Sequence, residues 1–176
     1  MGGGIKSLDE ISQLLRHGAD KVSLNSAALK NPDFIQQASQ KFGKQCICIA
    51  IDSLYDQSTN DYYCCTHGGK RQTPVHVYDW VRQVEALGAG ELLITSMAHD
   101  GMKQGFDITH LNQISKLVNI PIIASGGGGH AQHFTELFTQ TPVSAGLAAS
   151  ILHDKETTVA AIKRELNQGG VPVRWT

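Results

Sequence analysis

Short apolar runs alternate with longer amphipathic stretches along the whole chain. Runs rich in branched apolar residues predict five strands, at residues 21–24, 45–51, 91–95, 120–124 and 143–148. Between these runs, apolar residues recur every three or four positions, as on the buried face of a helix. Such alternation predicts an α/β fold, with a parallel sheet whose strands are joined by right-handed helical crossovers.

Sequence signals also mark the ends of several helices. Ser7, with Glu10 three positions later, predicts a capping box at the start of the first helix, and Gly18 predicts its end. Residues 31–32, Asn-Pro, are typical of a helix start, and the glycines at 169–170 should end the last helix. The predicted strands and helices are therefore bounded by residues that suit those positions.

Residues 52–74 interrupt this rhythm. The segment is polar, with paired tyrosines at 62–63 and paired glycines at 68–69. Aromatic residues favour strands and glycines favour the turns between them. The sequence therefore predicts a mobile hairpin over the strand ends.

Composition narrows the class of protein. With 176 residues, 41% of them hydrophobic, and a formal net charge of −1, the chain is expected to form one globular domain over residues 1–176. Neither a basic stretch for nucleic acid nor an apolar run long enough for a membrane is present. The four cysteines do not resemble a disulfide framework, and no signal peptide is evident, so a cytoplasmic location is expected. His130 and His133 lack a third ligand nearby, so no metal or cofactor is expected.

Two glycine-rich turns occupy similar positions in the two halves of the chain. Three glycines stand at 2–4 and again at 126–128, and a serine follows each group at the same spacing, at Ser26 and Ser150. Glycines let backbone N–H groups approach an anion, and a helix N-terminus adds partial positive charge. The repeat predicts two phosphate sites, hence a substrate with a phosphate at each end; the alternative is that both clusters are only tight turns.

Polar residues follow the predicted strands at the end where parallel α/β proteins place their reacting groups. Asp52 ends the apolar strand 45–51, and a carboxylate in that position either caps the next turn or acts as a general acid/base. The turn at 100–101, Asp-Gly, either contributes to a phosphate site or is a plain turn. The other strand ends carry Asn25, Ser26, Thr95, Ser125 and Ser150.

Several of these segments together resemble a known family. They read GGGIKS, GADKVSLNSAA, AID, DGMKQGFD, IASGGGG and LAAS in chain order. The set resembles the cyclase subunit of imidazole glycerol phosphate synthase, from histidine biosynthesis, and the likeness runs from Gly2 to about Arg174. Members of that family are (β/α)₈ barrels built from two similar halves, which accounts for the repeat.

The resemblance implies a reaction and a partner. The family's cyclase receives ammonia from a glutaminase subunit and adds it to a phosphoribulosyl-formimino aminoimidazole carboxamide ribonucleotide, which carries two phosphates. Ring closure and cleavage give imidazole glycerol phosphate and an aminoimidazole carboxamide ribonucleotide. The resemblance therefore implies a lyase that forms a heterodimer with a glutaminase.

The same resemblance assigns roles to individual residues. Asp52 would be one of two acid/base aspartates, Lys21 and Glu91 would belong to a charged gate for ammonia, and Asp20 would face the glutaminase. The remaining expected contacts are Gly4, Asn25 and Ser26 for one phosphate, Asp100, Gly101, Gly127, Ala149 and Ser150 for the other, and Thr95 and Ser125 in the pocket between them.

The chain is short for such a barrel, which usually needs about 250 residues. The resemblance implies a partial barrel of five parallel strands that lacks the family's first three strands, and with them the second catalytic aspartate. We therefore expect weak or no activity from this chain alone. Its exposed strand edges predict self-association, unless the chain rearranges into a flavodoxin-like sheet with helices on both faces.

Other functions stay open from the sequence. A cyclase-like paralogue that passes ammonia to a surface-sugar precursor would share these motifs, whereas the related isomerase of histidine biosynthesis fits them less well. A non-catalytic phosphate-binding α/β module is a further alternative. Phosphate binding without turnover would favour the module.

Overall fold

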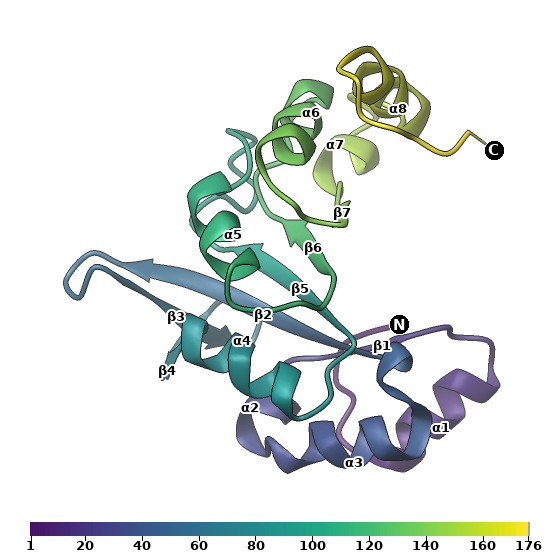
Figure 1. The fold of residues 1–176 in the computed structure, drawn as a ribbon, viewed down its shortest axis with the longest axis vertical. Coiled ribbons are helices and arrows are strands. Elements are labelled where there is room, and N and C mark those ends of the chain that lie inside the picture. Colours follow the sequence, from purple (N-terminus) through teal and green to yellow (C-terminus); the bar gives the residue numbers. More distant parts are fainter. Residues whose placement is uncertain (176) are drawn as a thin grey trace.

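A computed structural model describes residues 1–175 and shows an α/β fold built around one curved sheet (Figure 1). The expected alternation of strand and helix is present, and the capping box joins Ser7 and Glu10 as predicted. The helices are α1 (Leu8–Arg16), α2 (Ser26–Lys30), α3 (Asp33–Phe42), the 3₁₀ turn η1 (Lys44–Cys46), α4 (Val77–Ala86), α5 (Ile108–Ser115), α6 (Ala131–Gln140), α7 (Ser150–His153) and α8 (Val159–Gln168). The strands are β1 (Val22–Leu24), β2 (Ile47–Asp56), β3 (Asp61–Thr66), β4 (Arg71–His76), β5 (Glu91–Ser96), β6 (Ile122–Ser125) and β7 (Ala145–Gly146).

Strand β2 organises the sheet. Its first half pairs with β1 in parallel, and its second half pairs with β3 in antiparallel fashion. On its other side β2 pairs with β5, and β6 and β7 continue the parallel order. The five predicted strands are thus parallel neighbours, and β3 and β4 form the predicted hairpin; its mobility stays a prediction.

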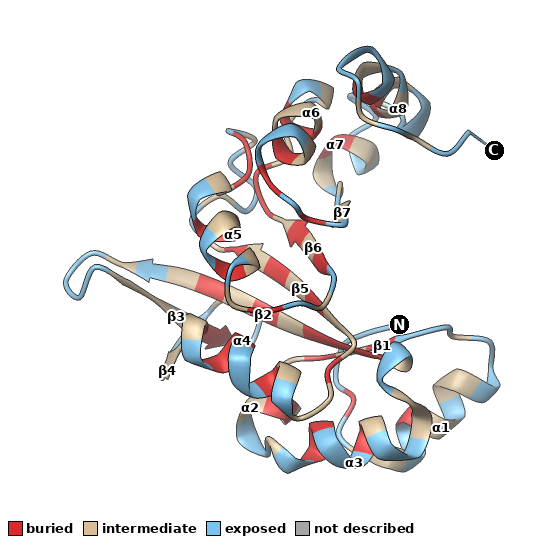
Figure 2. Ribbon diagram, viewed as in Figure 1, coloured by how far each residue is buried: buried red, intermediate tan, exposed pale blue. Residues whose placement is uncertain are grey.

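The helices lie along one side of this sheet, as in a barrel wall (Figure 1). Burial follows the same division, and the central strands carry buried and partly buried positions (red and tan in Figure 2). Ile49, Ile51, Leu92 and Ile94 are at most 1% exposed, whereas Leu93, on the other face, is only partly buried. The flavodoxin-like alternative required helices on both faces, and over residues 1–175 that arrangement is not seen. The partial-barrel expectation describes the structure better.

Several boundaries differ from the prediction. The predicted strand 45–51 includes Cys46, but Cys46 ends the 3₁₀ turn and β2 begins one residue later. The same strand continues to Asp56, because its second half pairs with the hairpin strand β3, so Asp52 lies within β2 and not at its end. The strand expected at 143–148 is ordered only at Ala145–Gly146. The outer edge of β1 was expected to have unpaired backbone groups, but the Ser23 N–H donates to the Met1 carbonyl over 2.8 Å. The edge of β7 away from β6 has no strand partner among the described residues.

Candidate functional site

Three predicted site residues form one row across the sheet. Asp52 pairs in register with Thr95, and Thr95 pairs with Ser125, so the three lie side by side on β2, β5 and β6. Each is partly buried, while the residue before it in the strand packs under the helices. Strand alternation therefore directs the three side chains to the face that no helix covers.

The surroundings of the Asp52 carboxyl group shift its pKa. Partial burial raises its pKa above the usual value, and the neighbouring Asp100 carboxylate acts in the same direction. The Asn25 amide and the backbone N–H of Gly69 oppose this shift by favouring the charged form. A carboxyl group with a raised pKa takes up a proton more readily than an ordinary aspartate, which suits it to act as a general acid/base.

The first predicted phosphate site borders a cavity of about 1270 Å³. Gly4, Asn25 and Ser26 line it, and Gly4 has a left-handed backbone (φ 74°) with open space where a side chain would project. Ser26 is the first residue of α2, a short helix that the sequence pattern did not reveal. The same cavity is lined by cations that sequence reasoning did not select: Lys6, Lys30 and Arg71.

The Asn25 side chain faces the candidate catalytic residue, Asp52, and not only the first phosphate site. Its Oδ1 atom is buried without a hydrogen-bond partner among the described residues. A buried amide oxygen without a donor is costly, so this atom is suited to accept a hydrogen bond from a ligand. Contact with a phosphate therefore stays a prediction for Asn25.

The second predicted phosphate site is built from two loops in close contact. Gly126 and Gly127 lie against the loop that follows β5, and the Gly105 N–H donates to the Gly127 carbonyl over 2.8 Å. A Cβ at residue 127 would lie 1.9 Å from the Gly105 carbonyl oxygen, so no other residue fits there. This contact brings the turn at Asp100 and Gly101 to the same end of the sheet as Gly127.

The remaining residues of the second site are tied to the same loop. Ser150 is the first residue of α7, and Ala149 is its N-cap residue. Just beyond α7, Asp154 and Glu156 both bind Lys103 of the loop after β5, at 3.4 and 2.5 Å. This ion network therefore joins the α7 segment to the loop that contains Asp100.

The opposite end of the strands carries the predicted gate residues. Lys21 Nζ and Glu91 Oε1 are 2.9 Å apart, and this contact raises the pKa of the lysine. Cys48 lies between them in the sheet, since its register partners are Ser23 and Glu91. Asp20, next to Lys21, is exposed. The structure thus pairs Lys21 with Glu91, and their role as a gate for ammonia stays a prediction.

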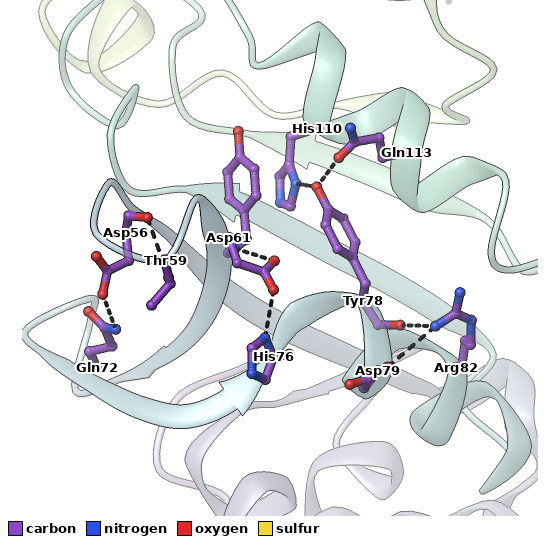
Figure 3. Close-up of polar contacts among 11 residues, drawn as sticks. Asp56, Thr59, Asp61, Gln72, His76, Tyr78, Asp79, Arg82, His110 and Gln113 are labelled. Atoms are coloured by element: carbon purple, nitrogen blue, oxygen red, sulfur yellow. Dashed lines mark hydrogen bonds and ion pairs between the residues drawn. The ribbon is translucent and has the colours of Figure 1, made fainter.

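A polar and aromatic cluster that sequence reasoning missed anchors the hairpin (Figure 3). The Tyr62 ring stacks on His110, with ring centroids 3.7 Å apart, and the Tyr62 hydroxyl donates to Asp107 over 2.9 Å. The His110 ring also contacts the Tyr78 hydroxyl and Ser53 Oγ, at 3.0 and 2.8 Å. Only the three-residue spacing of Asp107 and His110 at a helix start hinted at this cluster, because its other members come from separate elements.

His110 is neutral within this cluster. Burial lowers the pKa of its imidazole to about 4. The Tyr78 hydroxyl donates to Gln113, so its oxygen accepts from His110 Nδ1–H, and Nε2 is left to accept from Ser53. Since Ser53 follows Asp52 on β2, the cluster fixes the strand next to the candidate catalytic carboxylate.

The described residues also bear on disulfides, metal ligands and membrane-spanning helices. All four cysteines are free, and residues 1–175 contain no cluster of three or more His, Cys, Asp or Glu side chains that could hold a metal. His130 and His133 stack on each other without a further ligand. Within the part of the chain described, no helix has the length and apolar character to cross a bilayer.

Comparison with known proteins gives consistent results. Residues 1–158 match the family described as "Histidine biosynthesis protein". The chain is 72% identical over 174 residues to a protein of Staphylococcus saprophyticus named "Imidazole glycerol phosphate synthase subunit HisF", covering 99% of this chain and 69% of that protein. A Staphylococcus aureus protein of the same name is 74% identical with the same coverage.

Proposed function

Because this chain belongs to the histidine biosynthesis protein family, we propose that it is the cyclase subunit of imidazole glycerol phosphate synthase, a lyase-type enzyme on a (β/α)₈-barrel scaffold. Its reaction is the use of ammonia to form imidazole glycerol phosphate and an aminoimidazole carboxamide ribonucleotide. The observation that carries this proposal is the row of Asp52, Thr95 and Ser125 between two glycine-rich sites.

Two phosphate sites at one edge of the sheet suit a substrate with a phosphate at each end. Gly4 and Ser26 would hold one phosphate, with Lys6, Lys30 or Arg71 supplying positive charge. The Asp100–Gly101 turn, Gly127, Ala149 and Ser150 would hold the other. Since β1, β2, β5, β6 and β7 are parallel, both sites lie at the carboxyl ends of the strands, where the substrate would bridge them.

Asp52 is the group for proton transfer in this proposal. Ring closure requires protons to be moved between nitrogen and oxygen atoms of the substrate, and a carboxyl group with a raised pKa can do so in both directions. Thr95 and Ser125 would orient the substrate by hydrogen bonds from the same face. Asn25 Oδ1, which lacks a donor in the described structure, would accept one from the substrate.

The amino-terminal ends of the strands would receive ammonia from a glutaminase partner. Lys21 and Glu91 form an ion pair there, and Asp20 is exposed beside it. A charged pair at an entrance admits a small neutral molecule only when the pair moves or separates. We propose this end as the partner interface and a cytoplasmic location for the complex.

The chain covers 69% of the length of the relatives it matches. We infer that the unmatched part supplies the family's first three strands and the second acid/base aspartate, so that residues 1–176 are one partial barrel with weak or no activity alone. The open edge of β7 favours self-association in this form.

The test is an ammonia-dependent cyclase assay on this chain co-expressed with the part of the Staphylococcus saprophyticus protein that it does not match. Asp52→Asn should lower turnover by about 100-fold or more, a typical effect of removing a general acid/base. Asp56→Asn is the matched control, because Asp56 lies on the same strand but its carboxyl group is solvated beside Ser58. Equal turnover in the Asp52→Asn and Asp56→Asn complexes would remove Asp52 from the mechanism.

A further inference from the structure

The turn that joins β3 to β4 has an unusual backbone. His67, Gly68 and Gly69 are three successive residues with left-handed φ angles, of 57°, 65° and 79°. Such a run reverses the chain tightly and points consecutive N–H groups toward one side. The turn is therefore shaped to present backbone donors.

The position of this turn is set by strand pairing. Cys65 lies directly opposite Asp52 in the β2–β3 ladder, so the turn begins beside the candidate catalytic residue. Gly69 then reaches Met97, which follows β5 on the far side of β2: a Cβ at residue 69 would lie 2.1 Å from Met97 Cε. The turn thus crosses β2 at the level of Asp52, four residues before the strand ends at Asp56.

The hairpin is held in this position by contacts along its length. Gln72 Nε2 donates to Asp56 across the ribbon, and the Thr73 hydroxyl donates to the Cys64 carbonyl over 2.8 Å. Further out, His76 Nδ1 and Asp61 Oδ2 are hydrogen-bonded over 2.7 Å (Figure 3). The turn is therefore attached to the sheet on both of its strands.

We propose that the turn at residues 67–70 is a backbone clamp on Asp52, in which the Gly69 N–H donates to the carboxylate and a side chain at residue 69 would push the turn away from the Met97 side chain. Gly69 is then a positioning residue: it does not touch substrate, but it orients the carboxylate and sets its basicity. The contact itself does not depend on the proposed function, whereas its effect on turnover does.

The charges around Asp52 agree with this clamp. Burial and the Asp100 carboxylate raise the pKa of Asp52, while Gly69 and the Asn25 amide lower it. Cys65, opposite Asp52 on β3, is neutral because burial raises its own pKa. Loss of the Gly69 donor should therefore shift the pKa of Asp52 upward.

The first test measures the Asp52 carboxyl group directly, by ¹³C NMR titration of aspartate-labelled chain, with Asp52→Asn to assign the signal. Gly69→Ala should raise the pKa of Asp52. Gly68→Ala is the matched control, because it has the same left-handed strain but open space around its Cβ. Gly69→Ala with Met97→Ala should restore the original pKa, since truncating Met97 makes room for the new methyl group.

An Asp52 pKa that is unchanged by Gly69→Ala, or raised equally by Gly68→Ala, would overturn the clamp. If Gly69→Ala does not fold, amide hydrogen exchange gives the answer without any change at Gly69. Asp52→Ala should accelerate exchange of the Gly69 amide by about tenfold while the Gly68 amide is unaffected, as expected for loss of a charge-assisted hydrogen bond. Equal exchange at Gly69 in both chains would refute the contact.

These readouts separate the clamp from the proposed function. A raised pKa together with unchanged turnover in the co-expressed complex would keep the clamp and reject Asp52 as the catalytic group. An unchanged pKa together with the large loss of turnover in Asp52→Asn would do the reverse.

Discussion

His110 should make this protein lose stability in mild acid. Its imidazole is fully buried and has a pKa of about 4 in the folded chain, against 6.5 for an unperturbed histidine. The unfolded state therefore binds a proton at higher pH than the folded state does. The contribution of a neutral His110 is fully present above pH 6.5 and is lost as the pH falls from 6.5 toward 4.

The size of this effect follows from the shift. Each unit of pKa difference is worth about 1.4 kcal/mol, so the folded state should lose about 3 kcal/mol by pH 4 through His110 alone. The nearby Asp107 carboxylate favours the charged ring, but burial outweighs it. An effect of that size is a large part of the stability of a typical domain, about 5–15 kcal/mol.

Replacement by a residue that does not titrate should remove this dependence. His110→Gln should cost about 1–3 kcal/mol at pH 7, because it removes the stack on Tyr62 and leaves the buried Ser53 hydroxyl with a poorer partner. Urea unfolding at fixed protein concentration from pH 7 to pH 4 should show this deficit shrinking and then reversing. His130→Gln, at an exposed position, is the control. A deficit that stays constant across this range would refute the reasoning.

Three further predictions can be checked separately. Ser26→Asp and Ser150→Asp should each abolish one of two phosphate-binding events in calorimetric titration, because a carboxylate repels the anion; two unchanged events would mean that the glycine turns are only architectural. The chain should sediment as a species larger than its own 19.0 kDa at micromolar concentration, and a monomer would contradict association through the β7 edge. Ile94→Ala should cost about 2–5 kcal/mol in guanidinium unfolding, since Ile94 is 1% exposed, whereas Leu147→Ala, at a 39% exposed side chain, should cost far less.

Local signals in the sequence predicted the regular parts of the fold well. The capping box at Ser7, the apolar strand that leads to Asp52 and the glycines that end α8 each depend on neighbouring residues, and each is present, although that strand continues to Asp56. The strand at 143–148 was overestimated because apolar character cannot show that only Ala145–Gly146 has a partner to pair with. Pairing between distant segments decided that boundary.

The candidate site was predictable only where a polar residue follows an apolar run that predicts a strand. Asp52, Thr95 and Ser125 could be chosen from the sequence because parallel strands bring their carboxyl ends together. The contact of Gly69 with Met97 could not, since it depends on where the hairpin folds back. His110 was likewise hidden, because its partners lie on β2, β3 and α4.

The alternation of β2 has a consequence for how this molecule can fail during folding. If β2 paired one residue out of step, Asp52 would turn under the helices and Ser53 would take its place beside Thr95. Such a chain would keep its helices and most of its buried surface, yet it would offer no acid to a substrate. The bond between Ser53 and His110 forms only in the correct alignment. The aromatic cluster should therefore favour the correct register of β2. Damage to it should reduce the proportion of active molecules in a preparation rather than the turnover rate of each active molecule.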